Sequence, residues 1–100
     1  MPTPKPSRKL TTPRYRARLR ELWLRGRRIY KFSRPAPDLE LLLSVFEEDH
    51  WAQRVLNPFG GPAHQAHESL HNAVTRLNRR IKQIRFHLDG TGKGVLWQLA

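Results

Sequence analysis

The stretch HQAHESLHNAVTRLNRRIKQ, residues 64–83, carries the strongest structural pattern in this sequence of 100 residues. Large apolar residues recur in it at intervals of four, three and four. This spacing places them along one side of an α-helix. These residues are Leu70, Val74, Leu77 and Ile81. The opposite side is polar and basic, so the pattern predicts an amphipathic helix over 64–83.

The segment that follows directly, IRFHLDGTGKGVLWQL (84–99), alternates apolar and polar residues on both sides of a glycine-rich turn. Such alternation predicts two β-strands. The turn contains Gly90, Gly92 and Gly94, and glycine adopts positive φ without a steric penalty. We therefore expect a β-hairpin over 84–99, immediately after the helix.

A second hairpin is predicted upstream, in ELWLRGRRIYKF (21–32). Two short runs rich in strand-forming residues, 22–24 and 29–32, flank Gly26. The chain is therefore expected to turn at 25–27. Pro35 and Pro37 would end the second strand, because proline lacks the amide hydrogen that a strand needs.

A shorter helix is expected between the two hairpins. Asp38 is suited to cap its N-terminus, and the helix would run to about His50. Its apolar side consists of Leu39, Leu42, Leu43 and Phe46. Its acidic residues, Glu40, Glu47, Glu48 and Asp49, are interpreted as a solvated face. Residues 51–55 are compatible with a strand or a turn of helix, and the proline and glycine residues over 58–62 predict a break.

Composition indicates the kind of partner. Lys and Arg total 19 against 8 Asp and Glu, a formal net charge of +11. Such an excess favours a polyanionic partner, nucleic acid ahead of an anionic membrane. The absence of cysteine excludes disulfides and thiolate metal sites. Without a long apolar run or a secretory signal, we expect a cytoplasmic protein, nucleoid-associated if bacterial.

The basic charge is concentrated at the beginning of the chain. Residues 1–32 carry a net charge of +10, residues 33–50 carry −4 and residues 51–100 carry +5. Prolines at positions 2, 4, 6 and 13 predict an extended, flexible basic arm over residues 1–20, preceding a domain over 21–100. The arm is interpreted either as a solvated tail or as a segment that follows phosphates with Arg14, Arg16 and Arg18.

The polar side of the 64–83 helix is the candidate binding surface. Base edges in the major groove are read by arginine at guanine and by asparagine at adenine. The expected base-facing residues are Asn72, Thr75, Arg76 and Arg79. The expected phosphate contacts beside them are Arg80, Lys82, Arg85 and Lys93, which would position the protein without reading sequence. The alternative is an ordinary solvated cationic face.

Other motifs point to no second chemistry. The turn DGTGKG (89–94) lacks the earlier glycine and the Ser or Thr after the lysine that a Walker A loop requires. His64, His67 and His71 share one helical side, but no further ligand is apparent, so they are interpreted as exposed or capping residues. We expect no catalytic residue, no metal site and no cofactor, and therefore no enzyme.

LHNAVTRLNRRIK (70–82) followed by IRFHLDGTGKGVLWQL resembles the recognition helix and wing of OmpR/PhoB-type winged helix-turn-helix effector domains. The matching helix positions are Val74, Leu77, Arg79 and Ile81, and the matching strand positions are Gly92, Gly94, Val95, Trp97 and Leu99. The chain is also similar to short uncharacterised bacterial proteins whose first helix ends in Glu-Glu-x-x-Trp, here Glu47, Glu48 and Trp51.

The resemblance implies an α+β, winged-helix-like domain over 21–100 that binds double-stranded DNA and regulates transcription. One departure concerns the family's middle helix, for which this chain has only about a dozen Pro/Gly-interrupted residues. No receiver or sensor domain is present, so regulatory input would come from a protein partner. The oligomeric state is left open.

Two alternatives from other functional classes remain. One is an RNA- or ribosome-associated basic protein, in which the Arg/Pro-rich arm becomes ordered on RNA. The other is a protein-interaction module that uses the acidic helix and Trp51. No interaction with a membrane is expected.

Overall fold

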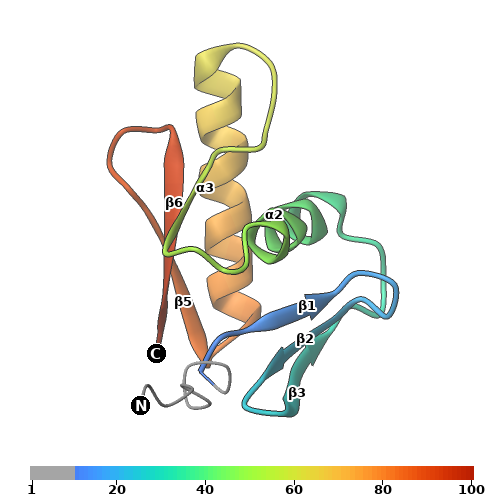
Figure 1. The fold of residues 1–100 in the computed structure, drawn as a ribbon. Helices are drawn as coiled ribbons and strands as arrows, with labels where there is room; N and C mark the ends of the chain where they lie inside the picture. The colour runs from blue at the N-terminus through green and yellow to red at the C-terminus, as the bar shows by residue number, and fades with distance from the viewer. Residues whose placement is uncertain (1–10) are drawn as a thin grey trace, which may run out of the picture.

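The structure, a computed structural model, describes residues 11–100, so the first ten residues of the predicted arm lie outside it. The fold is mixed α+β, and in the described residues it has two helices and two three-stranded antiparallel sheets (Figure 1). One sheet contains β1 (Arg14–Arg16), β2 (Glu21–Leu24) and β3 (Arg27–Lys31). The helices are α2 (Pro37–Glu48) and α3 (Ala63–Arg80). The other sheet contains β4 (Arg54–Leu56), β5 (Ile84–Leu88) and β6 (Gly94–Leu99).

The predicted upstream hairpin is confirmed as β2 and β3. Leu24 pairs with Arg27 across a two-residue loop. Arg25 and Gly26 in that loop have φ of 54° and 74°. Positive φ at both loop residues is typical of the type I′ turn, whose twist matches that of paired strands. The two strands run along the lower end of the molecule in Figure 1.

The predicted flexible arm over 1–20 is wrong for its second half. Residues 14–16 form β1, which pairs with β2 and adds a third strand to the sheet. Tyr15 faces the core and is 3% exposed, whereas Arg14 and Arg16 point to solvent. Pro13, just before the strand, is also buried.

The first helix begins and ends slightly differently from the prediction. Ala36, and not Asp38, is the N-cap, and Pro37 occupies the first turn, where its missing amide hydrogen has no partner to lose. The Glu40 carboxylate accepts a hydrogen bond from the Ala36 N–H at 3.0 Å. The helix stops at Glu48 because His50 and Trp51 take positive φ values of 56° and 57°.

The undecided segment after this helix contains strand β4. It pairs with β6, which is the central strand of the order β4-β6-β5. The β5–β6 hairpin confirms the predicted C-terminal hairpin. No helix lies between α2 and α3, so the described chain has only β4 and a loop where the resembled family has its middle helix.

The long helix confirms the prediction but ends three residues early, at Arg80. Its apolar stripe is buried as expected, with Leu70, Leu77 and Ile81 fully enclosed. Ile81 has extended backbone angles, φ −111° and ψ 123°. The chain therefore leaves the helix while this residue stays in the core, and it enters β5 three residues later.

The core lies between the helices and the two sheets. Phe46 of α2 stacks on Trp51 with their ring centres 5.1 Å apart, and Phe86 of β5 lies 5.7 Å from Phe46. The Trp97 indole donates hydrogen bonds to the backbone oxygens of Trp51 and Ala52. This aromatic cluster joins α2 to the second sheet, and it buries Trp51 to 4% exposure.

Candidate nucleic-acid interface

The outward face of α3 contains the four residues that the sequence predicts to face DNA bases. Asn72, Thr75, Arg76 and Arg79 are all exposed. They lie opposite the buried stripe because residues three, four and seven positions apart share one side of a helix. Glu68, the acid of this helix, lies on the same side one turn before Asn72. The core therefore sets which side of α3 is available to a partner.

Four cations lie at the C-terminal end of α3 or just after it. Within residues 11–100, no ion pair involves Arg76, Arg79, Arg80 or Lys82. All four side chains are exposed. An exposed cation without an acidic neighbour keeps its full attraction for an anionic ligand. This end of the helix therefore presents uncompensated positive charge.

Four cations of the first sheet and its turns are paired with carboxylates. Arg14 contacts Glu47 at 3.1 Å and Arg20 contacts Glu40 at 3.2 Å. Arg28 and Lys31 share Glu21. Hydrogen bonds from Arg28 and then from Trp23 lower the pKa of the Glu21 carboxyl, against the opposite effect of its burial. Part of the charge counted at the start of the chain is therefore used in ion pairs inside the fold.

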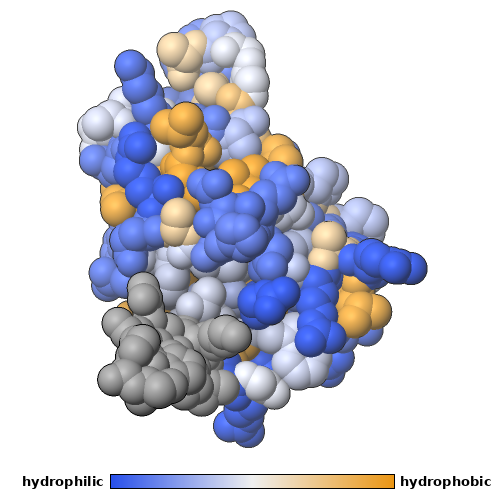
Figure 2. Space-filling view, in the orientation of Figure 1, coloured by the Kyte–Doolittle hydropathy of each residue, from blue (hydrophilic) through white to orange (hydrophobic). Residues whose placement is uncertain are grey.

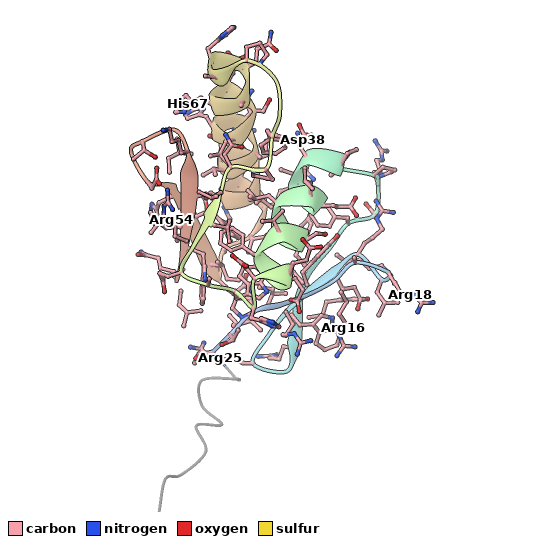
Figure 3. All side chains as sticks on the ribbon, turned by 45° about the horizontal axis from the view of Figure 1, so that its top comes forward. Arg16, Arg18, Arg25, Asp38, Arg54 and His67 are labelled. Atoms are coloured by element: carbon pink, nitrogen blue, oxygen red, sulfur yellow. The ribbon has the colours of Figure 1, made fainter. Side chains whose placement is uncertain are left out.

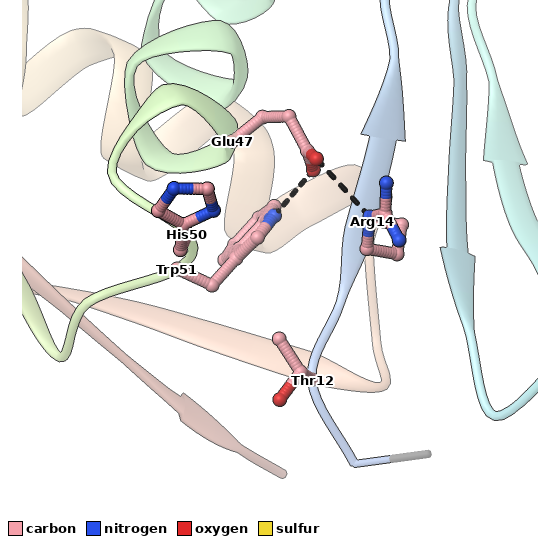
Figure 4. A pocket seen from close by; sticks show the side chains of 5 residues that line it. All are labelled: Thr12, Arg14, Glu47, His50 and Trp51. Atoms are coloured by element: carbon pink, nitrogen blue, oxygen red, sulfur yellow. Dashed lines mark hydrogen bonds and ion pairs between the residues drawn. The ribbon is translucent and has the colours of Figure 1, made fainter. Parts of the chain in front are cut away.

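The interpretation of Glu40 and Glu47 as part of a solvated face is wrong. Glu47 Oε1 accepts hydrogen bonds from the Tyr15 N–H at 2.7 Å and the Trp51 indole at 2.9 Å. Figure 4 shows the bond from Trp51 and the contact of the same carboxylate with Arg14. Burial raises the pKa of the Tyr15 phenol, and its hydrogen bond to Glu40 raises it further. These two carboxylates attach α2 to the first sheet.

A shallow pocket of about 530 Å³ lies beside Glu47. Thr12, Arg14, His50 and Trp51 complete its lining (Figure 4). The carboxylate and the Arg14 guanidinium already contact each other there. Their polar groups therefore serve the junction between α2 and β1, and the predicted phosphate role of Arg14 competes with this ion pair.

Arg16 and Arg18 lie away from the N-terminal half of α3. Figure 3 shows both arginines at the end of the molecule that holds the first sheet, whereas His67 lies near the opposite end of α3. The Arg16 guanidinium lies 5.0 Å from the centre of the Trp23 ring. Arg18 is exposed in the turn between β1 and β2. The predicted phosphate contacts therefore occupy two ends of the molecule rather than one.

Asn78 connects α3 to the C-terminal hairpin, a role that the sequence pattern did not reveal. Its amide donates to the Phe86 carbonyl at 2.8 Å and accepts from the Phe86 N–H at 2.8 Å. It thus pairs with the outer edge of β5 as a neighbouring strand would. Arg85, a predicted phosphate contact, donates to the Asn78 carbonyl at 3.3 Å. The orientation of the hairpin against α3 is fixed by these bonds.

The hairpin tip is held by a network around Asp89. This carboxylate accepts hydrogen bonds from the hydroxyl and N–H of Thr91 and from Arg54. The bonds from Thr91, and then that from Arg54, lower the pKa of Asp89 from 3.8 to about 2, although burial opposes them. Arg54 is labelled beside β4 in Figure 3.

Two of the three turn glycines have the predicted role. Gly90 and Gly92 have φ of 89° and 78°, but Gly94 does not have positive φ. A Cβ at Gly94 would lie 2.5 Å from Asp89 Oδ2 and 2.7 Å from Arg54 Nε. Glycine is needed there because the ion pair passes directly over the backbone.

The hairpin tip reaches the N-terminal half of α3. A hollow of about 430 Å³ is lined by His64 and His67 on the helix and by residues 90–93 on the hairpin. Lys93 is exposed at this tip. Since α3 is about 27 Å long, Lys93 and Arg80 lie toward opposite ends of one continuous helix-and-hairpin surface.

The remaining surface features do not extend this interface. Figure 2 shows apolar surface where the chain passes from β4 to α3. Leu56, the last residue of β4, is 66% exposed. Among residues 11–100, no three His, Asp or Glu side chains are grouped so that they could hold a metal ion. In the same residues, neither helix is long and apolar enough to cross a membrane.

Comparison with known proteins adds no relative. No protein-family model, no curated protein and no solved structure matches this chain.

Proposed function

We propose that this protein binds double-stranded DNA in the manner of a winged-helix domain. In this proposal α3 enters the major groove, and the β5–β6 hairpin acts as a wing against the neighbouring backbone. Asn72, Thr75, Arg76 and Arg79 would face base edges. Arg80, Lys82, Arg85 and Lys93 would contact phosphates. A role in transcriptional regulation, with input from a protein partner, belongs to the same proposal.

One observation carries this proposal. The exposed side of α3 has cations without acidic partners, whereas three arginines of the first sheet and its turns, Arg14, Arg20 and Arg28, each contact a glutamate. Folding does not require Arg76 or Arg79 to be charged, since neither forms a hydrogen bond or ion pair within residues 11–100. These exposed side chains are therefore available to bind an anionic ligand such as DNA.

The rigid attachment of the hairpin gives further support. Asn78 fixes β5 to α3, and the tip lies against His67. Two elements held in fixed relative positions can contact adjacent parts of a duplex without first being ordered. This arrangement favours a rigid double-stranded ligand over a flexible single strand.

The first test is a salt titration of binding to duplex DNA, single-stranded RNA and structured RNA, measured by fluorescence anisotropy. The variants are the full chain and a chain without residues 1–10. A truncation to residue 20 is unsuitable, because it would delete β1 and the buried Tyr15. We expect duplex binding to survive removal of residues 1–10. A preference for RNA at every salt concentration would contradict the proposal.

RNA binding by the first sheet is the second candidate. Arg18 and Arg25 are exposed and, within residues 11–100, form no ion pair. The half-buried Trp23 with Arg16 over its ring combines an aromatic surface with a cation, as single-strand binding surfaces do. Arg18→Gln would then weaken RNA binding more than Arg79→Gln does. Trp51 offers no comparable surface to a protein partner, because its ring is buried.

A further inference from the structure

A groove of about 350 Å³ lies between α3 and the connection from β3 to α2. Arg76 and Arg80 form its helical side. Residues 30 and 32–36 form the other side, with Arg34 and Ser33 next to the aromatic rings of Tyr30 and Phe32. We call it the Arg34 groove. Arg34 was not among the predicted site residues, because in the sequence it lies more than 40 positions from Arg76.

The Arg34 groove carries three positive charges and no negative one among its lining residues. Arg34, Arg76 and Arg80 are exposed, and none of them forms an ion pair within residues 11–100. The acids that follow in the chain do not neutralise them. Glu40 is held by Arg20, Tyr15 and the Ala36 N–H, and Asp38 is exposed outside the lining.

The chemistry of the lining indicates a phosphate group. Arginine presents several N–H donors in one plane, a geometry that matches the oxygens of a phosphate. Three such side chains around one hollow can contact different oxygens of the same group. The Ser33 hydroxyl is exposed beside them and can donate a further hydrogen bond.

We propose that the Arg34 groove binds a backbone phosphate of the same DNA duplex that α3 reads, an inference that rests on the proposed function. Arg76 is both a predicted base-facing residue and part of the groove lining. The base-facing residues and the groove would therefore contact one continuous ligand. A helix-turn-helix protein uses its first helix to cross the DNA backbone. This chain has no helix between α2 and α3, and Arg34 supplies a backbone contact from a different part of the fold.

The test compares Arg34→Gln with Arg27→Gln in the full chain. Both substitutions remove one exposed arginine without an ion pair, but Arg27 lies outside the groove. One phosphate contact contributes about −0.9 to the slope of log affinity against log salt. We therefore expect Arg34→Gln to weaken duplex binding about eightfold near 0.1 M salt and to reduce the slope by about one. Equal effects of the two variants on duplex affinity and on the salt slope would reject the proposal that the Arg34 groove binds a phosphate.

Two further measurements separate failure of the groove from failure of the proposed function. If Arg79→Ala weakens duplex binding but Arg34→Gln matches Arg27→Gln, the groove is rejected and DNA binding by α3 stands. If the wild type does not bind duplex, the proposed function fails and the groove has no duplex phosphate to bind. Thermal melting of each variant checks folding, which Arg34→Gln should leave unchanged because this side chain makes no hydrogen bond within residues 11–100.

The source of the phosphate is tested with inorganic phosphate at constant ionic strength. If the groove binds a duplex phosphate, millimolar inorganic phosphate should compete only weakly with duplex DNA, and to the same extent for the wild type and for Arg34→Gln. Strong competition that disappears in Arg34→Gln would reject the duplex as the source and assign the groove to a free phosphate compound.

Discussion

The first sheet and helix α3 are both rich in arginine, but they differ in how those charges are balanced. Arg14, Arg20 and Arg28 each contact a glutamate. Arg76 and Arg79 contact no acid within residues 11–100. A charge that holds two elements together acts on stability, whereas an unpaired exposed charge acts on ligands. Arginines in two regions of one small protein can therefore have different functions.

The largest expected effect is on the paired side of this comparison. Glu47→Ala removes the acceptor for the Tyr15 N–H, the Trp51 indole and Arg14. We expect the free energy of unfolding to fall by about 3 kcal/mol, because buried donors lose a charged partner. Urea denaturation measures the change. Glu48→Ala is the matched control, since Glu48 is exposed and its loss should change stability by less than about 0.5 kcal/mol.

The unpaired side should behave in the opposite way. Arg79→Ala is expected to leave the melting temperature unchanged and to reduce discrimination between DNA sites by ~1–3 kcal/mol. Selection of preferred sites from a random duplex library, followed by affinity measurements on matched and mismatched sites, measures this. A uniform loss on every sequence would show that Arg79 contacts phosphate and not bases.

Asn78→Ala should lower the stability of the protein moderately and loosen the edge of β5. The substitution leaves the N–H and carbonyl of Phe86 without their partner at the outer edge of β5. We expect a loss of about 1.5 kcal/mol in unfolding free energy, and faster amide hydrogen exchange at Phe86. Asn72→Ala, on the exposed side of the same helix, should leave this exchange unchanged. Unchanged exchange in Asn78→Ala would show that the edge of β5 is protected by other means.

The smallest expected effect is the pH dependence of the hairpin tip. The folded-state pKa of Asp89 is about 2, below its ordinary value of 3.8, because of its bonds to Thr91 and Arg54. A lowered folded-state pKa adds stability above about pH 4, and this stability is lost as the pH falls toward 2. Thermal melting between pH 5 and pH 2 should therefore show a shallower decline in Asp89→Asn than in wild type. Parallel curves would show that the network is weak in solution.

The regular elements were predictable because their signals are local. The spacing of Leu70, Val74 and Leu77 defines α3 without knowledge of any other part of the chain. The alternation in 84–88 and 94–99 similarly defines β5 and β6. Strand β1 was missed because its three residues contain one apolar side chain, and its partner β2 begins only after a four-residue turn.

The predicted base-facing residues were placed correctly on the exposed side of α3, since helical periodicity determines which side of a helix is buried. Their contact with DNA stays a prediction. Asn78 and Arg34 could not be identified in this way. Asn78 acts through the backbone of Phe86, and Arg34 belongs to a groove formed by two distant segments.

The sequence by itself determined the helices, the two hairpins and the excess of positive charge, because each follows from neighbouring residues or from a simple count. Only the tertiary structure decided which charges are available to a partner. An ion pair requires two side chains to lie within a few ångströms. Arg14 and Glu47 are 33 residues apart in the chain, and Arg54 and Asp89 are 35 apart. Folding brings these pairs together and leaves Arg76 and Arg79 exposed, since no acid of the described chain packs against that side of α3 closely enough to pair with them.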